Sequence, residues 1–311
     1  MHLRYLLPRR VATLTLVALL AACASLSDPT PAPRKEIAYA LTARMELIKF
    51  NTGDPQRILE RTAISGLPAD ERLLGLDFRV ARGVLYSVSN IGRLYTVNTA
   101  TAEVKAVAVT DTAPVLPIFS PGRAVAGYAL TGSAFGFDFN PVADRIRIVS
   151  DEGLNLRLHP DTGVVVDSNP AVPGIQVDGA LAYVAGDVNF GKKPTLVAAA
   201  YTYNKQDDKL TTNYAIDRDL GLLVMQGSKE GETPVVSPNT GALRSIGPLG
   251  LGPLREASFD IADISGAAFA VVRSAADVRT RLFLIDLKTG RASALGTVGD
   301  GKPVLGLAIE P

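Results

Sequence analysis

The stretch GFDFNPVADRIRIVSDEGLNLRLHPDTG, residues 136–163, decides the fold of this chain. It contains three short apolar runs, and each run is followed by a polar or glycine-containing turn. Alternation of apolar and polar residues over such short runs is the pattern of half-buried β-strands. The stretch therefore predicts one small unit of antiparallel sheet.

This unit has copies elsewhere in the chain. Its opening tetrapeptide GFDF returns as GLDF and SFDI without a gap, so an aspartate takes the same position each time: Asp77, Asp138 and Asp260. The chain ends in VLGLAIEP (304–311), which opens like a further copy with Ala308 in the aspartate position. In the segment 178–249, DGALAY offers only Asp178, which is out of register. The chain is thus predicted to be a set of repeated sheets.

The repeats predict an all-β chain, a β-propeller with five blades. The first strand–turn–strand unit, residues 45–64, lacks a preceding GLDF-type strand, and the C-terminal segment supplies one. Closing the ring in this way removes exposed sheet edges. A sixth blade is predicted if 178–249 divides into two sheets, and a β-sandwich is the alternative fold. The expected blades are 37–65 with 304–310, 73–110, 134–168, 178–249 and 256–298.

The N-terminus predicts export and lipidation. A basic segment, MHLRYLLPRR, precedes an uncharged apolar run, which is the organisation of a signal peptide over residues 1–22. The run ends in LAAC, which resembles the bacterial lipobox and predicts acylation of Cys23, the only cysteine in the chain. Residues 23–36 are then the lipidated cysteine and a Pro-rich tether, and 37–311 are the propeller domain.

The composition limits the partners. Cleavage before Cys23 leaves 29 basic and 31 acidic residues, a formal charge of −2. This balance gives no electrostatic basis for binding nucleic acid. We expect a cell-envelope lipoprotein held to the membrane through its lipid. Ala24 and Ser25 after the cysteine favour the outer membrane, facing the periplasm or the surface.

The central block resembles a known family. FDFNPVADRIRIVSDEGLNLRLHPDTG, then VDGALAYVAGDVNFGKKPTLVAAAYTYN and NTGALRSIGPLG, are similar to the bacterial DUF4394 family over roughly residues 40–310. The resemblance implies an exported, propeller-like domain, and it carries over no catalytic residues.

Two groups of residues are candidate sites. If Asp77, Asp138 and Asp260 face the central channel at one height, three carboxylates suit a hard cation such as Ca²⁺. The alternative is that each accepts backbone hydrogen bonds from its own or the adjoining blade. Arg145 and Arg147 share one strand face, and Arg157 lies on the next strand. These three arginines are candidates to clamp a carboxylate or phosphate of a ligand, and the alternative is an exposed face of cross-strand ion pairs.

Catalytic motifs are scarce. His159 is the only histidine after signal cleavage, which excludes multi-histidine metal sites. It lies in the recurring turn HPDTG, where a polar residue has a structural role by default. The long insertion 111–133 and the segment 169–179 are predicted to cover one mouth of the channel.

These observations favour a non-catalytic propeller that binds an envelope protein, a glycan or a small ligand and needs no cofactor. The alternative is a hydrolase or lyase that uses carboxylates, with or without Ca²⁺, in the channel.

Overall fold

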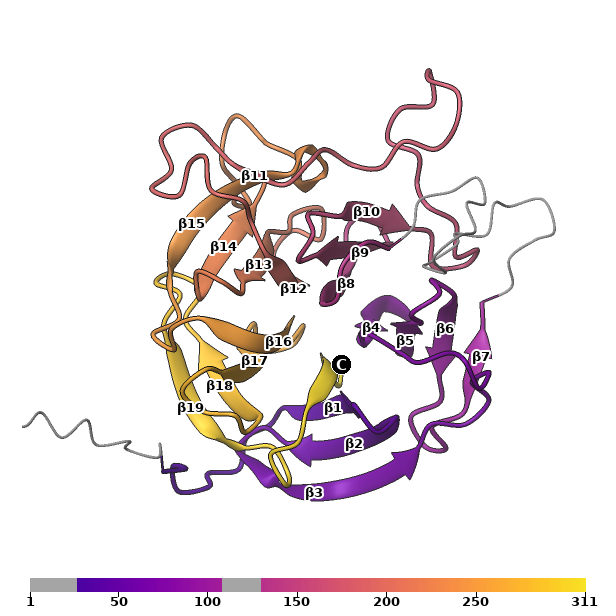
Figure 1. Ribbon diagram of the computed structural model, residues 1–311, viewed down its shortest axis with the longest axis vertical. Coiled ribbons are helices and arrows are strands. Elements are labelled where there is room, and N and C mark those ends of the chain that lie inside the picture. The colour runs from indigo at the N-terminus through magenta and orange to yellow at the C-terminus, as the bar shows by residue number, and fades with distance from the viewer. Residues whose placement is uncertain (1–26, 108–129) are drawn as a thin grey trace, which may run out of the picture.

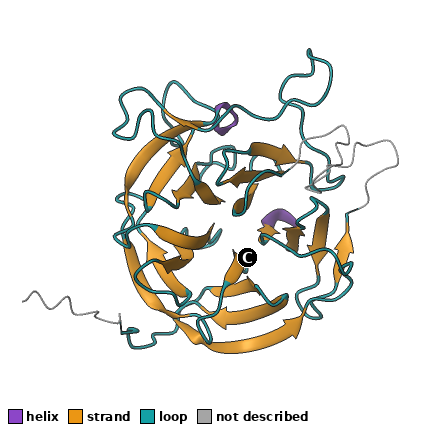
Figure 2. Cartoon of the chain, viewed as in Figure 1, coloured by secondary structure: helices purple, strands orange, loops and turns teal. Residues whose placement is uncertain are grey.

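The computed structural model describes residues 27–107 and 130–311. Strands dominate this part of the chain, and its only helices are two short 3₁₀ turns, η1 (Val80–Arg82) and η2 (Pro238–Thr240) (Figure 2). None of the helices in these residues is long and apolar enough to cross a membrane. The described residues form five mainly antiparallel sheets arranged around a central axis (Figure 1). This is the predicted five-bladed β-propeller.

The blades are numbered in chain order, with strands given from the centre outward. Blade 1 contains β20 (Val304–Ile309), β1 (Ile37–Thr42), β2 (Glu46–Asn51) and β3 (Asp54–Ala63). Blade 2 contains β4 (Asp77–Arg79), β5 (Val84–Val88), β6 (Leu94–Val97) and β7 (Val104–Ala106). Blade 3 contains β8 (Phe135–Asn140), β9 (Arg145–Ser150) and β10 (Asn155–Leu158).

The two remaining blades complete the ring. Blade 4 contains β12 (Leu196–Tyr201), β13 (Asn213–Asp217), β14 (Leu222–Gln226), β15 (Ala242–Pro248) and β11 (Ala182–Tyr183). Blade 5 contains β16 (Leu254–Ile261), β17 (Ala268–Ser274), β18 (Arg281–Ile285) and β19 (Ala292–Thr297). Segment 178–249 is therefore one sheet, and the possible sixth blade is excluded.

The C-terminal strand closes the ring. β20 pairs antiparallel with β1, so that Ala38 faces Ile309 and Ala40 faces Leu307. Glu310, just beyond β20, accepts hydrogen bonds from Tyr39 (3.3 Å) and Lys49 (3.1 Å). The first blade is thus assembled from both ends of the chain, as the split repeat predicts.

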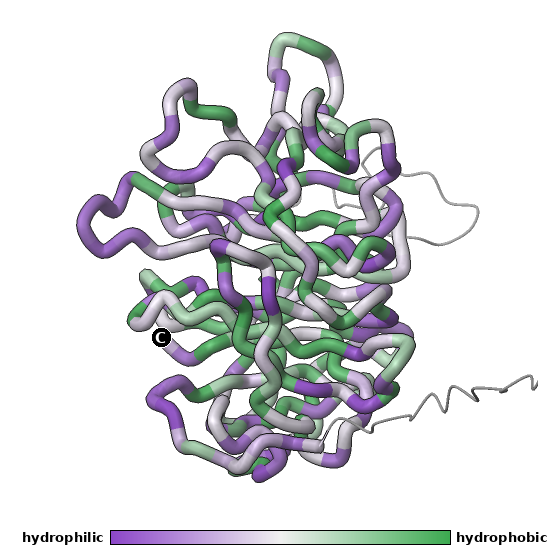
Figure 3. The backbone as a smooth tube through the Cα atoms, turned by 90° about the vertical axis from the view of Figure 1, so that its left-hand side faces the viewer, coloured by the Kyte–Doolittle hydropathy of each residue, from purple (hydrophilic) through white to green (hydrophobic). Residues whose placement is uncertain are grey.

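The apolar core is divided among the five junctions between blades. Each junction buries one cluster of side chains, such as Phe137, Ile146 and Leu156 of blade 3 against Tyr86 of blade 2. Hydrophobic segments accordingly gather in the stacked sheets, and hydrophilic segments occupy many of the connecting loops (Figure 3). Because every blade is flanked by two others, its strands are buried on both faces, which explains why β12 is apolar throughout.

The inner strands approach one another closely, and this requires small residues. A Cβ on Gly136 would lie 2.7 Å from backbone atoms of Ala198 and Ala199 in β12. A Cβ on Gly75 would lie 2.6 Å from Phe137, and one on Gly306 would lie 2.8 Å from Leu76. The repeated glycine two residues before the aspartate position therefore lets each inner strand lie against the next.

Two predictions fall partly or wholly outside the described residues. Cys23 lies there, as does most of the 111–133 insertion. DGALAY, whose Asp178 is out of register with the repeated aspartate, contributes β11 at the outer edge of blade 4, where Ala182 and Tyr183 pair parallel with β15. The inner strand of that blade is β12, with Ala200 in the aspartate position.

Candidate functional site

Three aspartates of the inner strands converge at the centre of the ring. Asp77, Asp138 and Asp260 lie on β4, β8 and β16 and are almost completely buried. One carboxylate oxygen from each lies within 4.8 Å of those from the other two. The structure thus brings together the residues that the repeat alignment singled out.

Each aspartate accepts a hydrogen bond from the next blade. Oδ2 of Asp77 accepts from the backbone N–H of Phe139 (2.7 Å), and Oδ2 of Asp138 accepts from Tyr201 N–H (2.8 Å). Oδ2 of Asp260 accepts from Ile309 N–H in the closing strand (2.5 Å). The acceptor is always in the aspartate position, and the donor is always one residue beyond that position in the following blade. The carboxylates therefore connect blade 2 to 3, 3 to 4, and 5 to 1.

The other two junctions have alanine at the equivalent positions, Ala200 and Ala308. At these junctions the aspartate of the following blade accepts a hydrogen bond from the N–H of the residue directly after it in its own strand. Oδ1 of Asp260 accepts from Ile261 N–H at 2.6 Å, and the N–H of Phe78 likewise interacts with Asp77. Every inner-strand N–H at this level therefore meets a carboxylate, although only three blades supply one.

Burial and mutual repulsion keep these groups protonated to unusually high pH. Burial raises the pKa of Asp77 and Asp138 well above the usual range, and nearby carboxylates raise both further. Burial raises the pKa of Asp260 to about 6, although its backbone hydrogen bonds act in the opposite direction. The interaction with Asp77 raises the pKa of Asp138, so this carboxyl holds its proton to higher pH than an exposed aspartate does.

The same oxygens are close enough for a cation to take the place of that proton. Three carboxylates are the donor type that Ca²⁺ prefers, and an oxygen that accepts one N–H keeps a second lone pair. A cation here would compete with the backbone hydrogen bonds that connect the blades. Ca²⁺ binding at Asp77, Asp138 and Asp260 stays a prediction.

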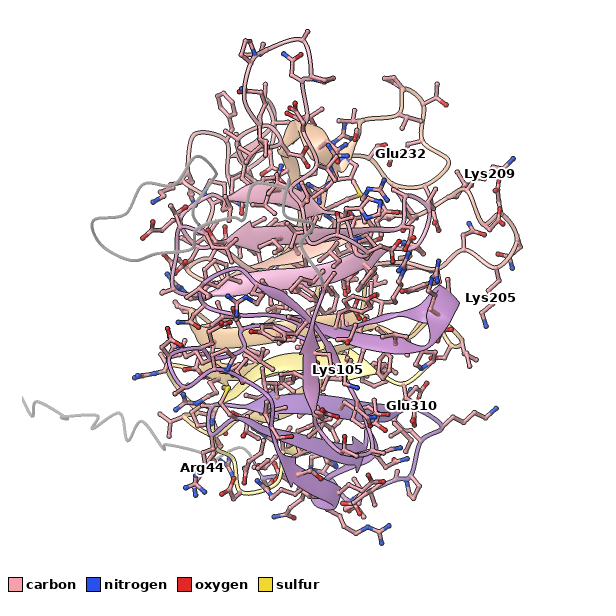
Figure 4. All side chains as sticks on the ribbon, turned by 90° about the vertical axis from the view of Figure 1, so that its right-hand side faces the viewer. Arg44, Lys105, Lys205, Lys209, Glu232 and Glu310 are labelled. Carbon is pink, nitrogen blue, oxygen red and sulfur yellow. The ribbon has the colours of Figure 1, made fainter. Side chains whose placement is uncertain are left out.

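A cavity of about 200 Å³ opens where the inner strands of blades 2 and 3 end. Sequence reasoning did not identify it, because its residues come from three strand ends that are distant in the chain. Lys205 and Glu310, which follow inner strands β12 and β20, lie toward one face of the propeller, and Arg44 lies on the other face (Figure 4). The cavity lining comprises Arg79, Val80, Ala81, Phe139, Asn140, Pro141, Asp144 and Tyr203.

The charged groups of this cavity favour a positive guest. Arg79 is buried and binds the carboxylates of Asp144 (Nε to Oδ1, 2.8 Å) and Asp161 (Nη1 to Oδ1, 2.5 Å), so one guanidinium faces two carboxylates. Burial raises the pKa of the Tyr203 phenol, and the three channel aspartates and Asp263 raise it further. Tyr203 therefore lines the cavity and is also close enough to the buried acidic groups to be affected by their charge.

The predicted arginine cluster is only partly assembled. Arg147 and Arg157 face each other across β9 and β10, and both bind Asp178, at 2.6 Å from Arg147 Nη1 and 2.8 Å from Arg157 Nη2. Arg147 is 1% exposed and also donates to Tyr201, Asn155 and Asn239. Arg145 instead donates to the carbonyl of Asp144. Asp178 binds both guanidinium groups and offsets one of their two positive charges. Ligand binding by the three arginines stays a prediction.

His159 lies in a turn, at the position that the repeat predicts. Its carbonyl accepts from Gly163 N–H at 2.8 Å, and its Nδ1 accepts from Asp161 N–H at 3.2 Å. The imidazole thus supports the turn that carries Asp161, one of the partners of Arg79.

The comparison with protein families identifies the family of this chain. The family described as "Domain of unknown function (DUF4394)" matches residues 46–308. The comparison with curated proteins finds no match.

Solved structures share only the general architecture. A protein of unknown function from Bacteroides thetaiotaomicron is 13% identical with a TM-score of 0.43, over 89% of this chain and 64% of that one. YCF48 from Cyanidioschyzon merolae is 15% identical with a TM-score of 0.36, over 85% and 71% of the two chains. YCF48 bound to D1 peptide is 10% identical with a TM-score of 0.35, over 86% and 69%.

Proposed function

We propose that this chain, which belongs to the DUF4394 family and folds as a five-bladed propeller, is an envelope-anchored binding protein. Its ligand site is the cavity beside Tyr203, and its ligand is a small organic cation such as an alkylammonium. The observation that carries this proposal is the cavity itself, about 200 Å³ in volume, at the ends of inner strands. That volume is below the range of drug-sized pockets and suits a ligand of a few heavy atoms.

The lining supports a cation with an apolar body. Phe139, Val80 and Pro141 offer apolar surface, and Tyr203 offers an aromatic ring to a positive charge. Asp144 lies at the cavity, and its side chain is 46% exposed, so it remains accessible to a guest while it binds Arg79. Asp161 shares Arg79, which leaves this group of three with one net negative charge. An anion would meet that charge and the acidic channel behind Tyr203.

Binding is favoured over catalysis by the state of the channel carboxylates. Asp77, Asp138 and Asp260 each hold a backbone N–H of the following blade. A group that connects two blades has little freedom to exchange protons with a substrate during a reaction. The arrangement is that of a scaffold presenting a site at its mouth.

The ligand site can be tested with three small probes of similar size. Propylammonium is expected to bind, whereas propanol and propionate are not, as measured by isothermal titration calorimetry or by NMR shifts. Replacing Tyr203→Ala removes the aromatic face and is expected to weaken propylammonium binding roughly 3- to 30-fold, since cation–π contacts contribute about 0.5–2 kcal/mol. Equal response to propanol, or full affinity in Tyr203→Ala, would contradict the site.

The charge contribution has its own matched pair of variants. Asp144→Asn keeps the size of the side chain, and asparagine tolerates the positive φ of 49° at this position. It is expected to weaken propylammonium binding, whereas Asp300→Asn, at an exposed carboxylate near blade 1, should leave binding unchanged. Equal effects of both variants would show a general charge effect and not a site.

The envelope anchor is a separate part of the proposal. It is supported by the basic segment, the apolar run and the LAAC sequence that ends at Cys23. Replacing Cys23→Ser is expected to move the protein from the membrane fraction to the soluble fraction. Unchanged fractionation would contradict lipidation and leave the cavity tests unaffected.

A second candidate function is a calcium-dependent hydrolase or lyase acting in the channel. The observation that favours it is the approach of the three carboxylates to within 4.8 Å. Under this alternative, calcium raises the unfolding temperature of the protein, and Asp138→Asn abolishes that rise. If EDTA and calcium give the same unfolding temperature, the binding function is favoured.

A further inference from the structure

The described part of the predicted tether lies against the propeller. Residues 27–36 make hydrogen bonds to blades 1 and 5, and Figure 1 shows their indigo trace beside β3 and β19. We call these residues the strap. Their contacts occur at two places, one at Asp28 and one around Gly53.

The first attachment is an ion pair with a buried guanidinium. Asp28 Oδ1 accepts from Arg281 Nη2 at 2.8 Å, and its Oδ2 accepts from Thr297 N–H at 3.1 Å. Arg281 is 1% exposed, and its Nε and Nη1 have no hydrogen-bond partner. Its other carboxylate, Asp277, is 3.8 Å away. A buried guanidinium needs a close partner, so Asp28 is the group that makes Arg281 tolerable inside blade 5.

The second attachment is a backbone contact with the β2–β3 turn. Ala32 N–H donates to the carbonyl of Gly53 at 2.9 Å. Asn51 accepts from Arg34 N–H at 3.0 Å and donates to the Arg34 carbonyl at 2.7 Å. A Cβ on Gly53 would lie 1.8 Å from the Ala32 oxygen, so only glycine lets the strap lie this close.

The strap spans the junction between the first and last blades. Its Asp28 end is bound to blade 5 and its Gly53 contact is on blade 1, while the Arg34 guanidinium lies 5.4 Å from the Phe269 ring centroid in blade 5. The chain is therefore fixed to the propeller rim well before β1 begins.

We propose that the strap holds the rim formed by β3 and β19 against a lipid membrane surface. This inference rests on the proposed lipidation of Cys23. Asp28 is five positions after Cys23, and at roughly 3.3–3.6 Å per residue the chain between them reaches at most about 18 Å. Without the strap contacts, the free chain would extend to Ile37 and reach about 48 Å. The strap contacts thus shorten the free chain between the lipid and the propeller. They also determine which side of the propeller faces the lipid.

The test uses two features of the sequence. The chain has no tryptophan, so one introduced tryptophan is a specific reporter, and Cys23 is the only cysteine, so a maleimide lipid couples there alone. Arg57→Trp places the reporter on β3, where the Arg57 side chain is 75% exposed. Val172→Trp places it in the segment between β10 and β11, at the opposite edge of the ring (Figure 1).

The lipid-coupled protein, without residues 1–22, is bound to phosphatidylcholine vesicles that contain headgroup spin-labelled lipid. Fluorescence of the Arg57→Trp reporter is expected to be quenched several-fold more than that of Val172→Trp. Adding Asp28→Ala or Gly53→Ala to each reporter protein should make the quenching at position 57 equal to that at position 172. Lys35→Ala changes an exposed residue of the same strap and should preserve the difference.

The outcomes separate this inference from the proposed lipidation. Equal quenching at both positions, or a difference that survives Asp28→Ala and Gly53→Ala, would overturn the role of the strap. Chemical coupling supplies the lipid, so this result does not depend on acylation in cells, which the Cys23→Ser fractionation tests. Hydrogen exchange of the Ala32 amide provides a second measurement. It is expected to be slow in the parent protein and fast in both strap variants, and fast exchange in the parent would also overturn the proposal.

Discussion

Burying a carboxylate in the middle of a strand is costly, and the inner strands bury three of them. Asp77, Asp138 and Asp260 are retained because each satisfies an N–H in the adjoining blade that would otherwise be buried without a partner. The raised pKa of Asp77 and of Asp138 favours their neutral form, which lowers the electrostatic cost of burial. These residues stabilise junctions between blades that have no direct sheet pairing.

Because Asp138 acts as a hydrogen-bond acceptor between blades, two substitutions at this position are expected to differ in their effect on stability. Asp138→Ala leaves the Tyr201 N–H without its acceptor and is expected to lower the free energy of unfolding by about 1–3 kcal/mol. Asp138→Asn keeps an acceptor oxygen and removes a charge, so it is expected to be neutral or stabilising at pH 8. Urea unfolding of both variants measures the difference. An Asp138→Asn protein as unstable as Asp138→Ala would show that the charge itself is required.

The raised pKa values predict how stability varies with pH. The folded state holds protons on the three carboxyls to higher pH than the unfolded chain does. Their stabilisation is therefore complete below the unfolded pKa, near 4, and is lost as pH rises through the folded values, about 6 for Asp260. Urea unfolding should show a lower free energy at pH 8 than at pH 5, and Asp138→Asn should flatten this slope. A free energy of unfolding that rises from pH 5 to pH 8 would contradict the raised pKa values of these carboxyls.

The repeat alignment singled out the three aspartates that come together, because repetition places equivalent residues at one height of the ring. It did not predict the partners of Arg147. Asp178 lies beyond the copied unit, and Asn239 comes from blade 4, so their approach to Arg147 is a tertiary event. The repeat alignment also did not identify Tyr203, because this residue follows the inner strand of blade 4, which carries no aspartate.

At the level of strands, the spacing of inner strands depends on the small residue two positions before the aspartate. Blade 5 has Ser258 there, and its Oγ accepts from Leu307 N–H at 2.9 Å. The position therefore holds only small residues: glycine in blades 1, 2 and 3, Ala198 in blade 4 and Ser258 in blade 5.

Gly136→Ala tests this constraint. The added methyl would meet backbone atoms of β12 at 2.7 Å, which a side-chain rotation cannot relieve. We expect a loss of about 1–3 kcal/mol or more in the free energy of unfolding. Gly83→Ala is the comparison, because Gly83 has φ of 61° and no atom within 4 Å of an added Cβ, so only the conformational cost of about 1–2 kcal/mol applies. A larger loss for Gly83→Ala in urea unfolding would contradict the strand-spacing argument.

Strand prediction succeeded where alternation was present and failed where burial removed it. The strands of blade 3 fall within the predicted 134–168 unit. In blade 4, LVAAAY is apolar throughout because blades 3 and 5 cover both of its faces, so no alternation marked it as the inner strand. The aspartate in DGALAY drew attention to a segment that lies at the opposite edge of the same sheet.

At the scale of the whole molecule, the ring depends on its last strand. Deleting residues 304–311 removes the partner of β1 and leaves Asp260 without the Ile309 N–H. We expect loss of the cooperative thermal unfolding transition, because two open edges replace one closed ring. Deleting Pro311 alone should leave the unfolding temperature unchanged. A protein without 304–311 that unfolds at the parent temperature would contradict ring closure.

Both ends of the chain meet in blade 1, and this arrangement has a mechanical consequence. A force applied to the N-terminal end reaches the ion pair of Asp28 with Arg281 first, and then the contact between Ala32 and Gly53. Only after both contacts break does the load arrive at Ile37 and the β1–β20 hydrogen bonds. The strap would therefore take up the load first, and the β1–β20 pairing that closes the ring would stay unloaded while the protein is pulled from its N-terminal end.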